Sequence, residues 1–422
     1  MSPTRSGVRA DVLAMLSLVV ATATAQPRYH ITPLHNAEIL FGPTADLNER
    51  NQVVGWGSLR STPSTQGLRA TPGAGIDLIP SVIPGFAAAS PKAINDLGEV
   101  AGQAQNGFGS VAFYWSEATS TVQLEYPPAE SLSSSAQDIN NLGQIVGAAT
   151  STDELGTFAQ AMLWNPPYSQ PFGLGDLPGG DRFSHANAIN NHGVVVGQST
   201  TFRGGEAFVW SKDDGMQALP DAPDGLWAAS AHDINDLGQI VGQTTGGLPF
   251  FYDPEEGFHI LPPIKDITDY GLYAINSRGQ AVGEGWYLSR FQPPPSHAVI
   301  WDWEFGARDL NDFLSPVTPL PPGSHGNYLA IAWSINDQGR IAAVDRGANG
   351  YLLTPYSPCD VNCDGVVDVF DIDAFVEVLS APASVIDSQW RCPSTSAADA
   401  NMDGVVDNRD IDPFLRAVLR GG

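Results

Sequence analysis

A ten-residue phrase with asparagine at its third position constrains this chain more than any other feature, because it occurs seven times. One copy reads DINDLGQIVG and begins at Asp233. Successive asparagines are 41 to 60 residues apart. A repeat of that length is typical of a propeller blade or of another stacked unit. The seven asparagines are Asn48, Asn95, Asn140, Asn190, Asn235, Asn276 and Asn336.

The phrase has the residue order of a β-hairpin. Ile or Leu before the asparagine ends an apolar strand, and the asparagine side chain can bond to the backbone two residues further on. Three residues after the asparagine stands a glycine, which adopts a positive φ without strain. The first copy has Asn51 there, a residue type that tolerates the same conformation. We therefore predict that the phrase is a turn between two strands and not a ligand-binding motif.

Two further short elements recur between the phrases. One is aromatic and β-branched, as in EAFVW from Glu206, and the other ends in proline, as in MQALP from Met216. Each predicts one strand, and the proline suits an outer edge where a missing N–H does no harm. Four strands per unit and seven units predict an all-β fold, a seven-bladed β-propeller over residues 26–355. A β-solenoid or β-prism of the same repeats is the alternative.

The two ends of the repeat region complement each other. The last unit has no fourth strand, whereas the sequence YHITPL from Tyr29 precedes the first phrase and belongs to no unit. If this N-terminal strand completes the last unit, the ring closes and no sheet edge stays open. The first unit is the weakest, because the stretch from Leu59 to Thr71 shows no clear third strand.

Composition and the N-terminus bear on location. Acidic residues outnumber basic ones 46 to 20, which argues against binding nucleic acid or an anionic membrane surface. Residues 1–25 resemble a secretory signal peptide, with Arg5 and Arg9 before an apolar core (Val12–Val20) and an Ala23–x–Ala25 cleavage pattern. No later segment is long and apolar enough to span a membrane. We expect an exported, soluble protein that is extracellular or lies at the cell surface.

Residues 356–422 differ in character from the repeats and contain all three cysteines, Cys359, Cys363 and Cys392. Two stretches of twelve, residues 360–371 and 399–410, place Asp or Asn at positions 1, 3, 5, 9 and 12 and glycine at position 6. Hard oxygen ligands in that order, with a carbonyl at position 7, predict two calcium loops, each followed by a short helix. The predicted ligands of the two Ca²⁺ ions are Asp360, Asn362, Asp364, Val366, Asp368 and Asp371, then Asp399, Asn401, Asp403, Val405, Asp407 and Asp410.

Both regions resemble known families. The recurring phrases, such as AINDLGEVAG from Ala93 and HAVIW from His297, resemble the HAF family of probable extracellular repeat proteins over about residues 27–355. That family has no agreed biochemical activity, so the resemblance implies only an exported bacterial repeat protein. The two loops, each followed by one helix, resemble a type I dockerin over Asp360 to Leu419.

The dockerin resemblance implies folding on calcium and docking to a cohesin-like protein or to a cell-envelope component. Partner contacts in that family come from loop positions 10 and 11, which here are Val369, Phe370, Asn408 and Arg409. The two pairs differ in chemistry, so the symmetric docking of standard dockerins is not expected. The cysteine positions are similar to a planctomycete-type variant, which implies a Cys363–Cys392 disulfide, with Cys359–Cys392 as the alternative.

No catalytic residue is predicted. The histidines show no metal-ligand spacing such as HExxH, and no serine lies in a G-x-S-x-G setting. Trp56, Trp227 and Trp286 fall outside the strand register and could line a face that binds a glycan. We expect a secreted, non-catalytic repeat protein for recognition or surface display. A glycan-active enzyme, such as a polysaccharide hydrolase or lyase, and a structural surface protein are the alternatives.

Overall fold

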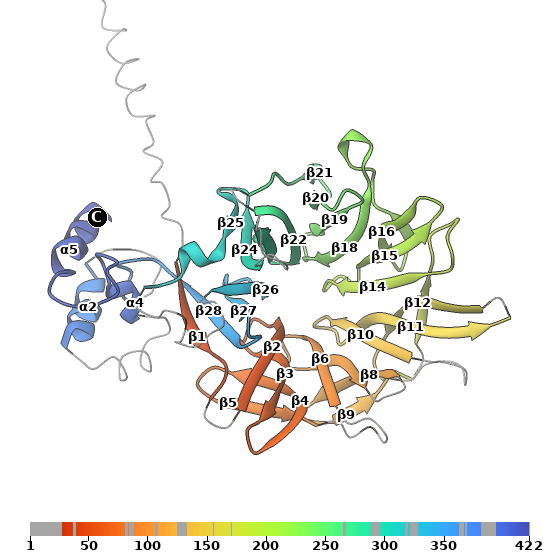
Figure 1. Cartoon of the computed structure of the whole chain (residues 1–422), viewed down its shortest axis with the longest axis horizontal. Helices are drawn as coiled ribbons and strands as arrows, with labels where there is room; N and C mark the ends of the chain where they lie inside the picture. The colour runs from red at the N-terminus through yellow and green to blue at the C-terminus, as the bar shows by residue number, and fades with distance from the viewer. Residues whose placement is uncertain are drawn as a thin grey trace, which may run out of the picture.

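The computed structural model describes a closed ring of sheets with a small helical region beside it (Figure 1). The signal peptide predicted for residues 1–25 lies outside the described residues. The description covers residues 28–421 except 37–38, 81–82, 84–87, 106–108, 125–132, 155, 170, 265–266, 288–295, 317–319, 321–327, 363–366, 368 and 381–393.

The ring is a β-propeller of seven four-stranded antiparallel sheets, as the repeat count predicts, so the solenoid and prism alternatives are wrong. In each blade the strands are given from the channel outward. Blade one contains β2 (Ile39–Leu47), β3 (Val53–Leu59), β4 (Thr62–Thr71) and β5 (Gly75–Ile79); blade two contains β6 (Ala88–Ile94), β7 (Val100–Gln105), β8 (Ser110–Ser116) and β9 (Ser120–Gln123); blade three contains β10 (Ser133–Ile139), β11 (Ile145–Asp153), β12 (Gly156–Trp164) and β13 (Phe172–Gly175); and blade four contains β14 (Ser184–Ile189), β15 (Val195–Thr201), β16 (Gly204–Ser211) and β17 (Gly215–Ala218). Blade five contains β18 (Ala228–Ile234), β19 (Ile240–Thr244), β20 (Pro249–Asp253) and β21 (Gly257–Ile260); blade six contains β22 (Ile267–Ile275), β23 (Ala281–Tyr287), β24 (Ser296–Asp302) and β25 (Gly306–Asp309); and blade seven contains β26 (Leu329–Ile335), β27 (Ile341–Asp345), β28 (Gly350–Tyr356) and β1 (Arg28–Pro33). Short 3₁₀ turns occur at Pro223–Gly225 and Leu310–Phe313.

Each repeated phrase forms the turn between the innermost strand and the second strand of a blade. The residue before the asparagine ends the innermost strand, and the glycine three places later has φ between +71° and +82° in six copies. Asn51 takes the same conformation in the first copy, with φ of 62°. The hairpin prediction is confirmed.

The N-terminal strand closes the ring. β1 pairs with β28 in antiparallel register, with Ile31 opposite Leu353, and it becomes the outermost strand of the last blade. Tyr29 and Ile31 are buried in the core that this blade shares with its neighbour. The closure prediction is therefore confirmed, and no edge is left where the two ends of the ring meet.

The first blade is complete, contrary to the expectation that it would lack a clear third strand. β4 pairs with β3 along the strand; for example, Gly55 lies opposite Leu68 and Trp56 lies opposite Gly67. Its sequence, TPSTQGLRAT, has none of the aromatic residues that the other third strands contain. Pairing on both sides overrides that weak local propensity.

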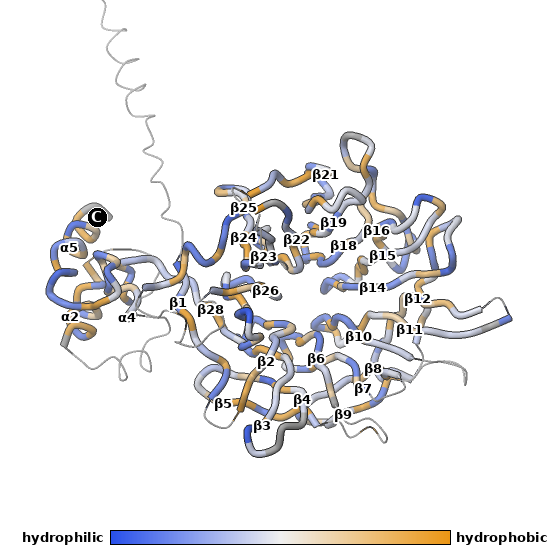
Figure 2. Tube along the Cα trace, viewed as in Figure 1, coloured by the Kyte–Doolittle hydropathy of each residue, from blue (hydrophilic) through white to orange (hydrophobic). Residues whose placement is uncertain are grey.

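The hydrophobic core is divided among the spaces between blades. The tryptophans that end the third strands, Trp115, Trp164, Trp210 and Trp301, are at most 7 % exposed. Figure 2 shows hydrophobic residues along the strands and hydrophilic ones where the innermost strands face the channel. The channel is thus the place where polar side chains from all seven blades meet.

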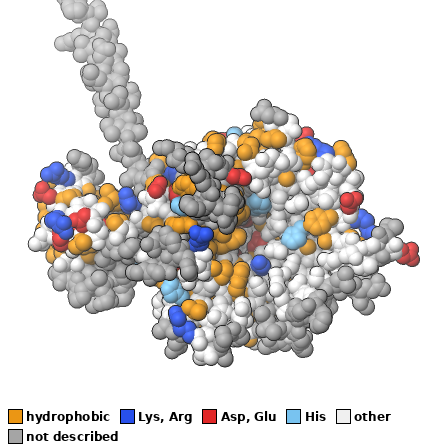
Figure 3. All heavy atoms as spheres, viewed as in Figure 1, with side chains coloured by type: hydrophobic (Ala, Val, Ile, Leu, Met, Phe, Trp, Pro, Cys, Tyr) orange, Lys and Arg blue, Asp and Glu red, His pale blue; other side chains and the backbone are white. Residues whose placement is uncertain are grey.

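In the described part of the chain, helices α2 (Asp371–Ser380), α4 (Ser394–Ala398) and α5 (Ile411–Gly421) lie beside the last blade. The predicted helix after each loop is confirmed by α2 and α5. Phe375 and Phe414 stack in their core, with ring centroids 3.8 Å apart, and Tyr356 at the end of β28 joins that core. In the described part of the chain no helix has the length and apolarity to cross a membrane. Figure 3 shows both signs of charge and hydrophobic side chains on this helical region.

The helical region contacts the seam where the ring closes. Ser396 Oγ lies 3.0 Å from His30 Nδ1 on β1 and accepts a 3.1 Å hydrogen bond from Ser315 Oγ. The backbone N–H of Cys359 donates to the Ala397 carbonyl. Cys359 itself is buried and free, and Cys392, its partner in the alternative pairing, lies outside the described residues. The predicted Cys363–Cys392 disulfide lies outside the described residues.

Candidate functional site

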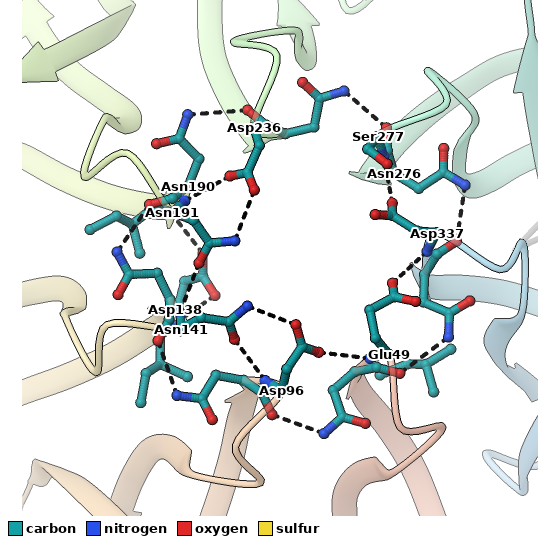
Figure 4. A pocket seen from close by; sticks show the side chains of 18 of the residues that line it. Glu49, Asp96, Asp138, Asn141, Asn190, Asn191, Asp236, Asn276, Ser277 and Asp337 are labelled. Carbon is teal, nitrogen blue, oxygen red and sulfur yellow. Dashed lines mark hydrogen bonds between the residues drawn. The ribbon is translucent and has the colours of Figure 1, made fainter.

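The seven phrase asparagines form a closed ring of hydrogen bonds around one end of the channel, which we call the asparagine end (Figure 4). Each side-chain Nδ2 donates to the backbone carbonyl of the asparagine in the next blade, at 2.8 to 3.1 Å. The last bond runs from Asn336 to Asn48 and joins the end of the ring to its start. The asparagines therefore hold neighbouring blades together as well as shaping their own turns.

The asparagine amides are almost fully used. In the fifth blade, Asn235 Oδ1 accepts from the N–H groups of Leu237 and Gln239. Its Nδ2 donates to the Asn276 carbonyl at 2.9 Å and to Gln239 Oε1 at 2.7 Å. These four bonds exhaust the capacity of the amide N–H groups and engage the oxygen twice. This explains why glutamine so often stands four residues after the asparagine, as in Gln52, Gln144, Gln239 and Gln280.

The residue after each asparagine adds an outer layer at the same end. For example, Asp236 Oδ1 accepts from the N–H of Asn191, and Asp96 Oδ1 accepts from the N–H of Glu49, each across a blade boundary. A cavity of about 210 Å³ opens here. Because its polar groups bond mainly to one another, we interpret the asparagine end as a structural clamp.

Toward the other end of the channel, every innermost strand carries a β-bulge at the same place, three residues before the asparagine. A bulge inserts one unpaired residue and re-aims its side chain. Unlike the asparagines, the residues at this place differ from blade to blade. In blade order they are Ala45, Lys92, Gln137, Asn187, His232, Tyr273 and Trp333.

The first position of the phrase, directly after the bulge, alternates between Asp and Ala along the chain. Hydrogen bonds between neighbouring blades explain this alternation. The two oxygens of Asp138 accept N–H bonds from Ile139 in its own blade and from Ile189 in the next blade, each at 2.7 Å. One carboxylate thus accepts hydrogen bonds from two blades. The next blade therefore requires no carboxylate of its own at this position, and it has Ala188 there. Asp46 and Asp233 do the same for the other pairs. Because the number of blades is odd, the last blade belongs to no such pair. At this position it has Ser334, whose hydroxyl donates a hydrogen bond to Asp46.

Asp46, Asp138 and Asp233 are surrounded by the blades, although part of each side chain lines the channel cavity. Burial, reinforced by the charges of Asp233 and Asp46, raises the pKa of Asp138 to about 8. Burial raises the pKa of Asp233 to about 6 and also raises that of Asp46. The backbone N–H bonds oppose these shifts without cancelling them.

We expect the raised pKa values to make the propeller less stable as pH rises from about 4 to 8. A folded carboxyl that keeps its proton, where the unfolded chain has already lost it, stabilises the fold. That contribution is complete below the unfolded pKa of about 4 and is lost progressively as pH rises to the folded pKa values of about 6 and about 8. The thermal midpoint at a series of pH values measures the slope. Asp138→Asn should flatten it and lower overall stability, because its Nδ2 would face the Ile189 N–H. The exposed Asp236→Asn variant is the control, and an equal slope in Asp138→Asn would contradict this assignment.

The bulge side chains line a cavity of about 190 Å³, which we call the bulge end. Asp46, Asp138 and Asp233 also line it. Tyr273 and Trp333 stack with their ring centroids 5.3 Å apart at an angle of 20°, and the His232 ring lies 6.0 Å from Tyr273. Blades five to seven therefore present an aromatic half-ring.

The other half of the bulge end is polar. Lys92, Gln137 and Asn187 come from blades two to four. Asn187 Nδ2 donates to the Ala231 carbonyl at 2.7 Å, and its Oδ1 lies 3.0 Å from His185 Nδ1. Burial lowers the pKa of Lys92 and of His232. His232 Nδ1 donates to the Leu272 carbonyl, which leaves Nε2 as a hydrogen-bond acceptor in the neutral ring.

The predicted calcium loops show part of the expected geometry. The carboxylate at position 12 accepts from the N–H at position 3 in both loops, Asp371 from Asn362 and Asp410 from Asn401. Gly404, at position 6 of the second loop, has φ of +88°. Asp364, Val366 and Asp368 of the first loop lie outside the described residues. Among the described residues, no three His, Cys, Asp or Glu side chains are grouped closely enough to hold a metal ion.

The second loop still fits a hard cation in its donor chemistry. Asp399, Asn401 and Asp403 turn their side-chain oxygens toward backbone N–H groups inside the loop, and Asp410 is fully buried. Burial raises the pKa of Asp399. A buried, unneutralised carboxyl pair is the environment that a calcium ion would stabilise.

The four predicted partner-binding residues are all exposed. Val369 and Phe370 are 62 % and 72 % exposed, and Asn408 and Arg409 lie on the corresponding part of the second loop. Arg409 forms ion pairs with Asp403 and Asp407. One pair is apolar and the other is polar.

Sequence reasoning missed the bulge end. It found no metal-ligand spacing among the histidines and gave them no role, whereas His232 lines the cavity. It singled out Trp56, over whose ring Lys92 Nζ lies at 5.5 Å, but not Trp333. A signal was present: aligning the seven phrases shows one position, three before the asparagine, at which nothing repeats.

No family model matches the sequence, and no curated protein is significantly similar to it. Several solved structures of other proteins are similar to it. Oligogalacturonate lyase in complex with manganese is 12 % identical, with a TM-score of 0.50 over 78 % of this chain and 93 % of that chain. The β-propeller domain of the Trilobed protease from Pyrococcus furiosus is 13 % identical, with a TM-score of 0.45 over 75 % and 95 %. YCF48 bound to D1 peptide is 12 % identical, with a TM-score of 0.47 over 78 % and 97 %. At such low identity these likenesses concern the fold alone.

Proposed function

We propose that this protein is a secreted, non-catalytic recognition protein that binds an extracellular polymer at the bulge end of its channel. The observation that carries the proposal is the bulge repeated in all seven innermost strands. Within one chain, the positions that build the ring are kept in every blade, while the one position re-aimed into the channel varies. The bulge position has seven different residue types in the seven blades and lines a cavity, which supports a binding role for that position.

We propose further that the C-terminal region binds two Ca²⁺ ions and docks the protein to a cohesin-like partner or to a cell-envelope component. The sequence pattern of both loops and the position-12 contacts of Asp371 and Asp410 support the calcium part. The exposed Val369 and Phe370 support a docking surface on the first loop. The propeller would then bind the extracellular polymer, while the helical region would anchor the protein to its docking partner.

Binding of insoluble polymers tests the recognition role. The full chain would be sedimented with suspensions of cellulose, chitin, mannan and bacterial peptidoglycan, with protein in the supernatant as the measure. We expect at least one polymer to remove the wild type and not the variant His232→Ala/Tyr273→Ala/Trp333→Ala, because that variant loses the aromatic half-ring.

The matched control changes the opposite face. Leu97, Leu142 and Leu237 are exposed at the asparagine end, so Leu97→Ala/Leu142→Ala/Leu237→Ala should sediment like the wild type. Circular dichroism would show that both triple variants are folded. Retained sedimentation by the bulge-end variant, its loss in the leucine variant, or binding to none of the polymers would contradict the proposal.

Calcium should stabilise the helical region. A ligand that binds only the folded state at 1,000 times its Kd adds about 4 kcal/mol. We expect EGTA to lower the thermal midpoint and the helical circular dichroism of the full chain, and CaCl₂ to restore both. Asp410→Ala should abolish most of this response, whereas Asp412→Ala, exposed on α5, should keep it. Identical melting curves with EGTA and CaCl₂ would exclude calcium binding.

A further inference from the structure

We infer that the bulge end takes a single neutral pyranose ring at the end of a glycan. This inference rests on the proposed recognition function and names the ligand class of that site. A cavity of about 190 Å³ is smaller than the roughly 300–1,000 Å³ of pockets that enclose a whole small-molecule ligand. It therefore suits one ring at the end of a longer molecule.

The division of the cavity into two halves matches a pyranose. Such a ring has an apolar C–H face and an edge of hydroxyl groups. Tyr273 and Trp333 stack on each other, and an outer face of this stack can pack against the C–H face of the sugar. Across the channel, Lys92 and Gln137 offer the amine and amide groups that bond to hydroxyls, whereas Asn187 is already bonded to the Ala231 carbonyl and to His185.

The acceptors in the cavity fit hydroxyl donors. His232 Nε2 is an acceptor because its Nδ1 donates to the Leu272 carbonyl. Asp46, Asp138 and Asp233 each accept two backbone N–H bonds or more and keep lone pairs toward the channel. A hydroxyl donates one bond and accepts others, so it can use both kinds of group.

The charge of the cavity selects against acidic sugars. The bulge end has one amine, that of Lys92, and three carboxyl groups, of which Asp138 keeps its proton at neutral pH while Asp233 is charged. A uronate or sulfated ring would bring a further negative charge into an enclosed space, where like charges repel strongly. Neutral rings avoid this repulsion.

Titration calorimetry of the full chain tests the ligand class. The probes are the methyl pyranosides of glucose, galactose, mannose and N-acetylglucosamine, with methyl glucuronide and methyl galacturonide as the acidic counterparts. We expect at least one neutral glycoside to bind with a Kd on the order of 1 mM, as few contacts provide. Each acidic counterpart should bind at least about tenfold more weakly.

Variants locate the sugar. Trp333→Leu should weaken binding about tenfold by removing the stacking surface, whereas Trp303→Leu, which changes an exposed tryptophan elsewhere, should not alter it. Preference for the uronides, or equal binding by wild type and Trp333→Leu, would overturn the inference. If no glycoside binds while polymer sedimentation still depends on the bulge end, the recognition function stands and the neutral-sugar assignment fails. If sedimentation shows no such dependence, both fail.

Discussion

Replacing Asn235 by aspartate should destabilise the propeller by about 3 kcal/mol or more. The substitution keeps the shape of the side chain but turns both donors into an acceptor. Two groups that now receive hydrogen bonds, the Asn276 carbonyl and Gln239 Oε1, would then face a carboxylate oxygen at 2.7 to 2.9 Å. Asn235 is 6 % exposed, so water cannot readily replace the lost bonds. Urea unfolding followed by tryptophan fluorescence measures the loss.

The neighbouring Asp236 provides the matched control. It is exposed, and the chain itself has asparagine at the same place in Asn141 and Asn191. Asp236→Asn should therefore change the free energy of unfolding by no more than about 0.5 kcal/mol. If Asn235→Asp were as mild as Asp236→Asn, the ring of amide bonds would contribute little and blade packing alone would hold the propeller.

Deleting β1, residues 28–33, should cost about 4 kcal/mol or more and promote aggregation. The deletion removes the buried side chains of Tyr29 and Ile31, each worth about 1.5–3 kcal/mol, and leaves β28 as an open edge. The thermal midpoint and light scattering of the full chain and the deleted chain measure the two effects. The exposed helical region should remain folded, because its core includes no β1 residue.

A point substitution in β1 separates the effect of ring closure from the effect of shortening the chain. Ile31→Asp places a charge at a position that is 4 % exposed and should destabilise strongly, whereas Pro33→Asp changes an exposed position at the end of the same strand. An unchanged midpoint in both the deletion and Ile31→Asp would mean that the ring does not depend on this strand.

The sequence contains enough to predict the architecture, because the repeat makes local signals reinforce one another. Asn235 and Gly238 specify a turn, the tryptophans at the ends of third strands specify a core, and the unpaired YHITPL specifies closure. The third strand of the first blade was not predictable from local propensity, because pairing with β3 and β5 stabilises it.

The site was harder to predict for two physical reasons. The bond from Asn235 to the Asn276 carbonyl joins residues 41 apart, and no local rule anticipates it. A β-bulge has no residue signature of its own, so Trp333 reads as an ordinary strand residue. Only comparison of the seven copies with one another separates the fixed positions from the variable one.

A crystal structure of the full chain with an oligosaccharide from the polymer that sediments it would test the central claim most directly. The recognition proposal predicts the terminal ring in the bulge end, within about 4 Å of Tyr273 and Trp333, with hydroxyls bonded to Gln137 or His232. The asparagine end should contain no sugar. An oligosaccharide bound at the asparagine end or on the helical region, with the bulge end empty, would contradict the assignment of the bulge end as the recognition site.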